Sequence, residues 1–569
     1  MLLGISESIS KRKKESALIM RKQTKLVAVL STAALLALGA SMSSFAATGW
    51  QEENGTWVYY DKSGDKETEK WEKSGDNWFY LDDNGEMATD VIVEYKDNFY
   101  YVDENGSMVA NKWVSVSNPD YDGEDEPTNF WYYFGSNGRA YKGASDKANF
   151  KTINGKKYTF DEDGKMQFGW ISNDDGKRDT ADDAWKTAEY YCGDENDGAQ
   201  TMGWKSLSIT DEDYDTNSDA INWSNKSVFD DEDQTRWFYF KSNGKKMADK
   251  DGESINGKKY SFDKFGRMNA EWVNVTTTPS NASASNTVTG WKYFKSPEDG
   301  ARVTKGWFKV VPDSYIDEGD NDDGDESWFY ADGKGQIYAN QIKEIAGKRY
   351  AFDSKGRMKN GFRLIKKGTG SSDIASIKGL DADNMYGHVD TEDDYKANIN
   401  DWLKHGYMLY NFGGGEDGSM KTGKQTLSLD GDNYTFSLTK SGANRGAGRN
   451  EIDSDKIYQG GMLLKADKDD KYAVVCVETV AANNADGYVP GKYFTMLSTE
   501  KFIHTYCDPA ATLGKDEKEA YVLKSNLNVT FKLVNTSGAI QSGKKSAKDG
   551  EDYVFTQKGE NIDRIYVKK

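Results

Sequence analysis

Aromatic clusters recur at a fixed step near the start of the chain. Three of them begin at Trp57, Trp78 and Phe99, so that consecutive clusters lie 21 residues apart, and Trp50 and Trp71 keep the same step. A fixed step of this length predicts a repeat array in which each repeat is one small supersecondary unit. Such a unit cannot bury its apolar face alone, so we expect consecutive units to stack into an elongated protein.

Each repeat combines a strand pattern with a turn signal. From Trp78 onward, alternating aromatic residues precede Asn84-Gly85. Alternation predicts a strand, and Asn-Gly is a strong hairpin signal because a type I′ turn needs positive φ at both central residues. We therefore place the hairpin turns at the pairs Asn84-Gly85, Asn105-Gly106, Asn137-Gly138, Asp163-Gly164 and Asn243-Gly244.

These patterns predict an all-β fold, namely an elongated β-hairpin repeat solenoid with a β-rich C-terminal region. Residues 47–440 form the repeat array, interrupted by acidic insertions such as 118–129 and 316–327. Residues 441–569 contain strand-like runs that we interpret as degenerate repeats or a cap.

The first 46 residues have the pattern of a secretory signal peptide. Basic residues from Arg21 to Lys25 precede an apolar stretch over 26–40, and a small-x-small sequence predicts cleavage after Ala46. Met20 directly precedes the basic residues and is an alternative start. The apolar stretch is too short to span a bilayer, and no second one follows. We therefore expect a secreted protein without membrane insertion after cleavage.

The chain is acidic, with a formal net charge of −19. Nucleic acids and anionic lipids attract basic surfaces, so the charge argues against both as partners. It leaves neutral sugars and cationic groups open.

The recurring order Gly-Trp, aromatic cluster, Asn-Gly and Met resembles the cell-wall-binding (choline-binding) repeat of Gram-positive surface proteins. It is also similar to the glucan-binding repeats of streptococcal glucosyltransferases. The resemblance covers about residues 49–440. It implies a left-handed β-solenoid with ligand sites between consecutive hairpins. Each site would be a cage made by the Trp of Gly-Trp, the Trp of the aromatic cluster and an aromatic residue of the next hairpin, with Met nearby.

The resemblance carries these roles to particular residues of the first repeats. The candidate cages are Trp50, Trp57 and Tyr80 in one set, and Trp71, Trp78 and Tyr101 with Met87 in the other. The tryptophans of later clusters are further candidates for the binding face, namely Trp131, Trp237, Trp291 and Trp328. Aromatic cages attract quaternary ammonium groups, whereas flat aromatic faces also stack on sugar rings. The ligand is therefore either choline on teichoic acid or a polysaccharide.

The main alternatives to these binding roles are structural. In a thin solenoid, many aromatic residues serve only as the core, and the methionines after the turns pack under the next hairpin. Asp320, Asp322 and Asp325 could bind calcium, but a closing Glu is absent, so we predict no metal and no cofactor. A disulfide between Cys476 and Cys507 is a further possibility.

We expect no catalysis, and therefore a non-catalytic surface protein or adhesin that binds wall polymers. His504 and Cys507 lie close in sequence, but no nucleophile motif surrounds them. Two alternatives remain: a wall hydrolase or carbohydrate enzyme with catalysis in the C-terminal region, and a purely structural surface protein.

Overall fold

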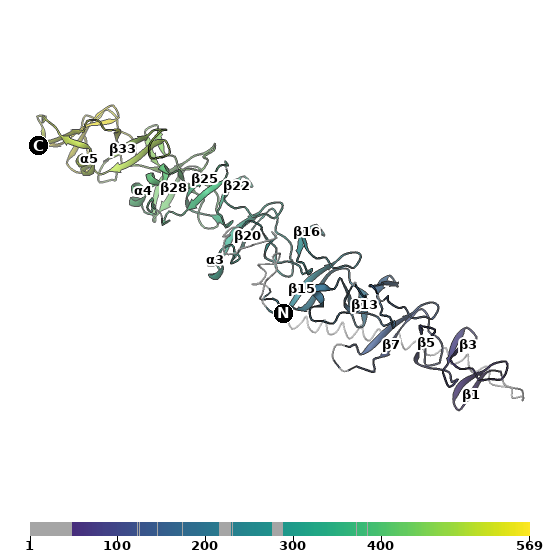
Figure 1. Cartoon of the computed structure of the whole chain (residues 1–569). Coiled ribbons are helices and arrows are strands. Elements are labelled where there is room, and N and C mark those ends of the chain that lie inside the picture. The colour runs from purple at the N-terminus through teal and green to yellow at the C-terminus, as the bar shows by residue number, and fades with distance from the viewer. Residues whose placement is uncertain are drawn as a thin grey trace. The chain divides into compact units, whose positions relative to one another are not determined.

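The computed structural model describes residues 48–569 except 122, 124–125, 145, 173, 215–228, 230, 276–287, 371 and 384. The predicted signal peptide therefore lies outside the described residues. Figure 1 labels many of the helices and strands described below. The chain divides into two compact units. The first unit comprises residues 1–212, 231–249 and 264–267, and the second comprises 213–230, 250–263 and 268–569.

The first unit is a succession of small antiparallel sheets, so the predicted all-β hairpin fold is confirmed. The hairpins pair β1 with β2, β3 with β4, β5 with β6, β7 with β8, β9 with β10, and β14 with β15, while β11, β12 and β13 form one sheet. The bounds of the strands are β1 Gly49–Glu53, β2 Thr56–Tyr60, β3 Lys70–Ser74, β4 Asn77–Leu81, β5 Val91–Tyr95, β6 Asn98–Val102, β7 Lys112–Ser117, β8 Asn129–Phe134, β9 Lys151–Ile153, β10 Lys156–Tyr158, β11 Gly169–Ile171, β12 Tyr190–Asp194, β13 Asp197–Gln200, β14 Gly203–Thr210 and β15 Asp233–Phe240. A short helix, α2 (Ala184–Thr187), precedes β12.

The hairpin turns lie before the aromatic strands and not after them. Asn54 and Gly55 join β1 to β2 with φ of 53° and 84°, the positive values that a type I′ turn requires. The pair Asn84-Gly85 forms a second tight turn after β4, in which the Asp82 carboxylate accepts hydrogen bonds from the N–H groups of Asn84 (2.9 Å) and Glu86 (2.8 Å).

The predicted position of the hairpin turns was therefore wrong by one strand. The other four predicted pairs also lie in the second turn of their own repeats. In each of these turns the N–H of the glycine donates to the carbonyl three residues earlier. The physical reason is that both turns contain residues at positive φ, and the aromatic strand lies between them. The sequence pattern of the aromatic strand does not distinguish the turn before it from the turn after it.

Backbone hydrogen bonds and methionine side chains connect successive repeats. The N–H of Met87 donates to the carbonyl of Trp57 at 2.7 Å, and the N–H of Met108 donates to the carbonyl of Trp78 at 2.8 Å. The thioether of Met87 lies against the next turn, where a Cβ on Gly106 would be 2.9 Å from its sulfur. Glycine at this position therefore leaves the space that the methionine of the preceding repeat fills.

The second unit begins with further hairpins and then changes architecture. Its first elements are β16 Lys250–Ile255, β17 Lys258–Phe262, β18 Trp272–Asn274, β19 Trp291–Tyr293, β20 Gly306–Val310, α3 Glu318–Asp322, β21 Ser327–Ala331, β22 Gln341–Ile345, β23 Lys348–Phe352, β24 Met358–Lys359, β25 Phe362–Lys367, β26 Ile374–Lys378, α4 Glu392–Lys404 and β27 Tyr407–Asn411. The Thr391 hydroxyl caps α4 by accepting from the N–H of Asp394. Trp402 of this helix is fully buried in the core.

Two larger sheets complete the second unit. The five-stranded sheet has the order β28-β29-β32-β31-β30, and the eight-stranded sheet follows the path β34-β33-β37-β40-β36-β35, with β39 paired to β40 and β38 paired to β39. The bounds are β28 Gly423–Leu429, β29 Asp432–Leu438, β30 Glu451–Asp453, β31 Lys456–Gln459, β32 Met462–Leu463, β33 Tyr472–Val480, β34 Gly491–Leu497, β35 Cys507–Pro509, β36 Glu517–Leu523, β37 Val529–Asn535, β38 Ala547–Lys548, β39 Tyr553–Lys558 and β40 Asn561–Lys568, with α5 Thr499–Tyr506 after β34. The smaller sheet crosses residue 440, where we had placed the end of the repeat array.

Candidate aromatic binding sites

The hairpin β3–β4 places three aromatic side chains on one face. Trp71 is paired with Tyr80 and Lys73 with Trp78 in the register of the two strands. Alternate residues of a strand point to the same face, so Trp71, Trp78 and Tyr80 share one; we call them the first aromatic group. The rings of Trp71 and Tyr80 have centroids 5.2 Å apart. Trp78 is 41% exposed, so one wall of the group is open to a ligand.

The following hairpin adds two more rings to this group. Tyr100 of β6 lies 5.2 Å from Trp71, and Tyr95 of β5 lies 6.1 Å from Tyr80, both measured between ring centroids. Tyr100 is buried. The group therefore lies where one hairpin meets the next.

The choice of ring from the next hairpin was wrong by one residue. Tyr101, expected beside Trp71, occupies the opposite face of β6, where it packs against Phe134 and its hydroxyl donates to Asp90. Trp50 likewise packs against Phe79 at 5.4 Å and not against Tyr80. A shift of one position along a strand moves a side chain to the other face.

Trp57 and Met87 are the two other members of the predicted cages. Trp57 is half-buried on the face that carries Trp50 and Tyr59, because Trp50 is paired with Tyr59 and Glu52 with Trp57. Met87 packs against Gly106, as described above, and so has a structural role in joining repeats.

Several carboxylates act electrostatically on the hydroxyl of Tyr80. Burial raises the pKa of Tyr80, and the charges of Glu69, Asp82 and Asp83 raise it further. The same negative potential that disfavours a phenolate favours a cation. The first aromatic group thus combines aromatic faces with an electrostatic preference for positive charge.

The later tryptophans fall into two classes. Trp237 meets Trp204 edge to face at 6.3 Å, and Trp328 meets Trp307 in the same way at 6.3 Å. Trp204 and Trp307 were missed as candidates, although the two-residue period of a strand and a correct hairpin register would have identified them.

Trp131 and Trp291 differ in burial. Trp131 is half-buried, and it contacts the same hydrophobic cluster as Trp113 and Tyr133. Trp291 is only 2% exposed and lies in a hydrophobic core with Trp272, so it is not available to a ligand and its assignment to the binding face was wrong.

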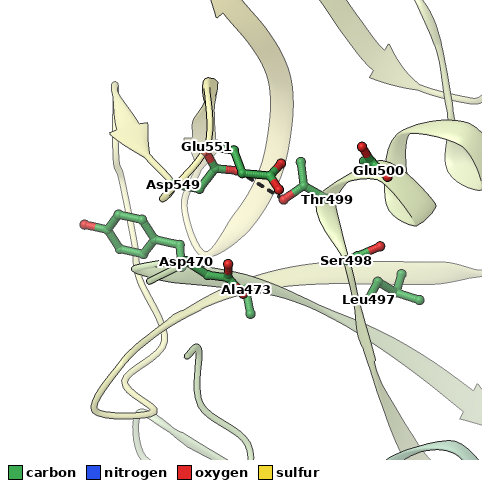
Figure 2. Close-up of a pocket in the computed structure, with 9 residues that line it drawn as sticks. Asp470, Ala473, Leu497, Ser498, Thr499, Glu500, Asp549 and Glu551 are labelled. Carbon is green, nitrogen blue, oxygen red and sulfur yellow. Dashed lines mark hydrogen bonds between the residues drawn. The ribbon is translucent and has the colours of Figure 1, made fainter. Parts of the chain in front are cut away.

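An acidic cavity lies in the C-terminal part of the second unit (Figure 2). It has a volume of about 100 Å³, and its lining includes Asp470, Glu500, Asp549 and Glu551. The hydroxyl of Thr499 donates to the Asp549 carboxylate at 3.2 Å. Burial raises the pKa of Asp549.

The cysteines differ from activated nucleophiles. Cys476 and Cys507 are buried free thiols, so the disulfide considered above is not formed. Burial raises the pKa of each to about 11, whereas a nucleophilic cysteine needs a lowered pKa.

The acidic insertion around α3 forms ion pairs. The carboxylate of Asp320 lies 2.7 Å from a guanidinium nitrogen of Arg357, and Asp317 pairs with Lys355 at 2.6 Å. Within the described part of the chain, no cluster of three His, Cys, Asp or Glu side chains is arranged to hold a metal ion. Nor do the described residues include a helix that is long and apolar enough to cross a membrane.

Two family models match the first unit. Residues 68–113 match the choline-binding repeat, and residues 131–140 and 149–166 match the putative cell wall binding repeat. The first match contains the whole of hairpins β3–β4 and β5–β6, and therefore the first aromatic group and the two rings beside it. No curated protein matches the chain.

Solved structures of Streptococcus pneumoniae proteins are also similar to this chain. The modular autolysin LytC is 17% identical over 56% of this chain and 55% of its own, with a TM-score of 0.29. CbpJ is 17% identical over 70% of this chain and 100% of its own, with a TM-score of 0.32. The choline-binding domain of Spr1274 is 29% identical over 17% of this chain and 95% of its own, with a TM-score of 0.13. This chain thus spans about half the length of the autolysin.

Proposed function

We propose that this chain, a cell-wall-binding protein built from choline-binding repeats, attaches to cell-wall polymers by holding choline groups between successive hairpins. The observation that carries the proposal is the first aromatic group. Trp78 is exposed beside Trp71 and Tyr80, within the segment that matches the choline-binding repeat.

The chemistry of the group suits a quaternary ammonium ion. A cation over an aromatic face gains about 0.5–2 kcal/mol per interaction. The carboxylates of Glu69, Asp82 and Asp83, which raise the pKa of Tyr80, add a long-range attraction for the same charge. A neutral sugar would use the ring faces and could donate hydroxyl hydrogen bonds to carboxylates, but it would gain no attraction between opposite charges.

Several weak sites on one chain would act together on a polymer. The edge-to-face pairs Trp204–Trp237 and Trp307–Trp328 are further candidates of the same kind. Simultaneous engagement of linked sites raises the overall affinity by about 10² to 10⁴ over a single site. Polymer retention would then be strong although each site is weak.

We propose a non-catalytic role for this protein at the cell wall, reached by secretion. Neither His504 nor Cys507 is among the residues that line the acidic cavity, and the buried thiols have raised pKa values. Hydrolysis of purified wall by the full chain would contradict this part of the proposal.

The proposal is tested by retention on purified choline-bearing wall. The chain from Ala47 to Lys569 is bound to the wall and eluted in parallel with free choline, soluble dextran and sodium chloride of matched ionic strength. Release by choline alone is the expected result. Release by dextran alone would show that the ligand is a polysaccharide and not choline. Release by salt alone would show that aromatic recognition is not responsible for retention on the wall.

A further inference from the structure

A second cavity, in the second unit, has more basic than acidic side chains in its lining. It has a volume of about 370 Å³ and lies beside the hairpin β22–β23. Its charged lining residues are Lys343, Arg349, Lys367 and Arg445, and one carboxylate, Glu344. The ammonium group of Lys343 lies 4.9 Å from the centroid of the Tyr338 ring, so Arg349, Lys367 and Arg445 form the cationic cluster. The lining therefore has a net positive charge, although the net charge of the whole chain is −19. Such a cavity attracts anions.

Glu344 compensates these cations only weakly. Its carboxylate lies 3.3 Å from the Nε of Arg349 and 3.8 Å from a guanidinium nitrogen of Arg445. Well-formed hydrogen bonds between guanidinium and carboxylate groups measure about 2.7–2.9 Å. The Nε of Arg445 is buried and, among the described residues, has no hydrogen-bond acceptor.

The fold holds the cations in place from three separate segments. Lys343 and Arg349 belong to the paired strands β22 and β23, and Lys367 is the last residue of β25. The ammonium group of Lys367 donates to the carbonyl of Ala443, which fixes the loop that carries Arg445. The cluster is therefore built into the fold and does not depend on one mobile surface side chain.

Keeping these charges together has an electrostatic cost. Burial lowers the pKa of Lys367, and the neighbouring charge of Arg349 lowers it further. A bound anion would remove this repulsion. The cavity thus has the electrostatic character expected of an anion site.

We infer that this cavity binds a phosphate group, with Arg349, Lys367 and Arg445 as its principal contacts. Arginine side chains present several N–H donors in a fixed fork that matches the oxygens of phosphate, and lysine adds a point charge. A tetrahedral phosphate offers oxygens in several directions, and so can meet donors that arrive from three segments. A planar carboxylate already occupies one side of the cavity as Glu344.

The experiment titrates inorganic phosphate into the chain from Ala47 to Lys569 by calorimetry, in chloride buffer of constant ionic strength. Saturable binding is expected, and Arg445→Gln should weaken it by about tenfold or more, because hydrogen bonds to charged groups are lost. Lys367→Gln serves as a second variant. Lys424→Gln, at an exposed position of β28, is the matched control and should bind phosphate like the parent.

Thermal unfolding confirms that each variant is folded. No saturable binding by the parent chain, or equal affinity in the parent and both cavity variants, would overturn the inference. A parallel titration with a poly(glycerol phosphate) chain identifies the source of the phosphate: tighter binding per phosphate indicates a polymer diester, and equal binding indicates the free anion.

This inference does not depend on the aromatic sites. The titration contains no choline, and Trp78→Ala should leave phosphate binding unchanged. Failure of choline recognition and failure of phosphate binding are therefore distinguished by separate measurements.

Discussion

The indole of Trp71 packs against the ring of Tyr100 with their centroids 5.2 Å apart, which joins the hairpin β3–β4 to the hairpin β5–β6. The same indole contacts Tyr80 on its own hairpin. One tryptophan thus serves both the packing of the repeats and the wall of the candidate site. Trp78 is more exposed, and in the proposed function it faces the ligand.

Replacing Trp78 with alanine should weaken choline binding without unfolding the protein. Trp78 is 41% exposed, so its removal takes away one aromatic wall, with a loss of about 0.5–2 kcal/mol of binding free energy. Calorimetric titration of choline measures the change. Tyr121→Ala, at an exposed aromatic residue outside the groups, is the matched control. An unchanged choline Kd in Trp78→Ala with an intact circular dichroism spectrum would remove this site.

Tyr101→Phe should reduce stability but not choline affinity. The Tyr101 hydroxyl donates to Asp90 on the face of β6 away from the first aromatic group, and loss of one such hydrogen bond costs about 1 kcal/mol of unfolding free energy. Urea unfolding and choline titration are measured on the same samples. Weaker choline binding in this variant would show that Tyr101 belongs to the choline site. It would contradict the finding that Tyr101 and the first aromatic group lie on different faces.

Gly106→Ala should destabilise the first unit through the contact with Met87. Gly106 has φ of 76°, and an added Cβ would lie 2.9 Å from the Met87 sulfur, so we expect a loss of about 1–3 kcal/mol. Gly155→Ala is the control, because its φ of 82° carries similar strain but no atom lies within 4 Å of its added Cβ.

The double variant Met87→Ala/Gly106→Ala separates the steric clash with the Met87 thioether from the backbone strain of alanine at positive φ. A favourable coupling between the two substitutions is expected, because removal of the thioether relieves the clash. Additive losses of stability would show that the two residues do not interact as described.

The stability of the second unit should fall as the pH rises from about 4 to about 7. Asp313 is only 8% exposed, and burial raises its pKa to about 7. The folded state therefore binds this proton more tightly than the unfolded state, so the contribution of Asp313 decreases between about pH 4 and pH 7 and is constant above. Asp313→Asn should remove a change on the order of 3–4 kcal/mol, measured by urea unfolding at pH 4.5 and pH 8. An identical pH dependence in the variant would refute the assignment.

The sequence predicted the repeat architecture but not the register of its faces. The spacing of Trp57 and Trp78 equals the length of one repeat, and stacking of the repeats keeps this length constant. The hairpin fold could therefore be predicted from the spacing. Tyr100 and Tyr101 are both tyrosines at adjacent positions, and either could face Trp71. Only the location of the hairpin turn determines which one does. The turn before β6 is Lys96-Asp97, two residues with positive φ but without glycine, so the sequence carries no glycine signal at that turn.

Contacts between residues that are distant in sequence were the least predictable part of the structure. The basic cavity brings together Arg349 of β23, Lys367 of β25 and Arg445 of the loop between β29 and β30. Nothing in the local sequence around these residues indicates that they meet. The burial of Trp291 also depends on neighbours such as Ile316, contributed by an insertion. Such contacts arise from tertiary packing, which a local pattern does not encode.

The most direct test of the central claim is a titration of choline into the chain from Ala47 to Lys569, followed by calorimetry and tryptophan fluorescence. The account predicts saturable choline binding that perturbs tryptophan emission and is weakened by Trp78→Ala. Saturable binding of dextran with none of choline, or choline binding that Trp78→Ala leaves intact, would contradict the account.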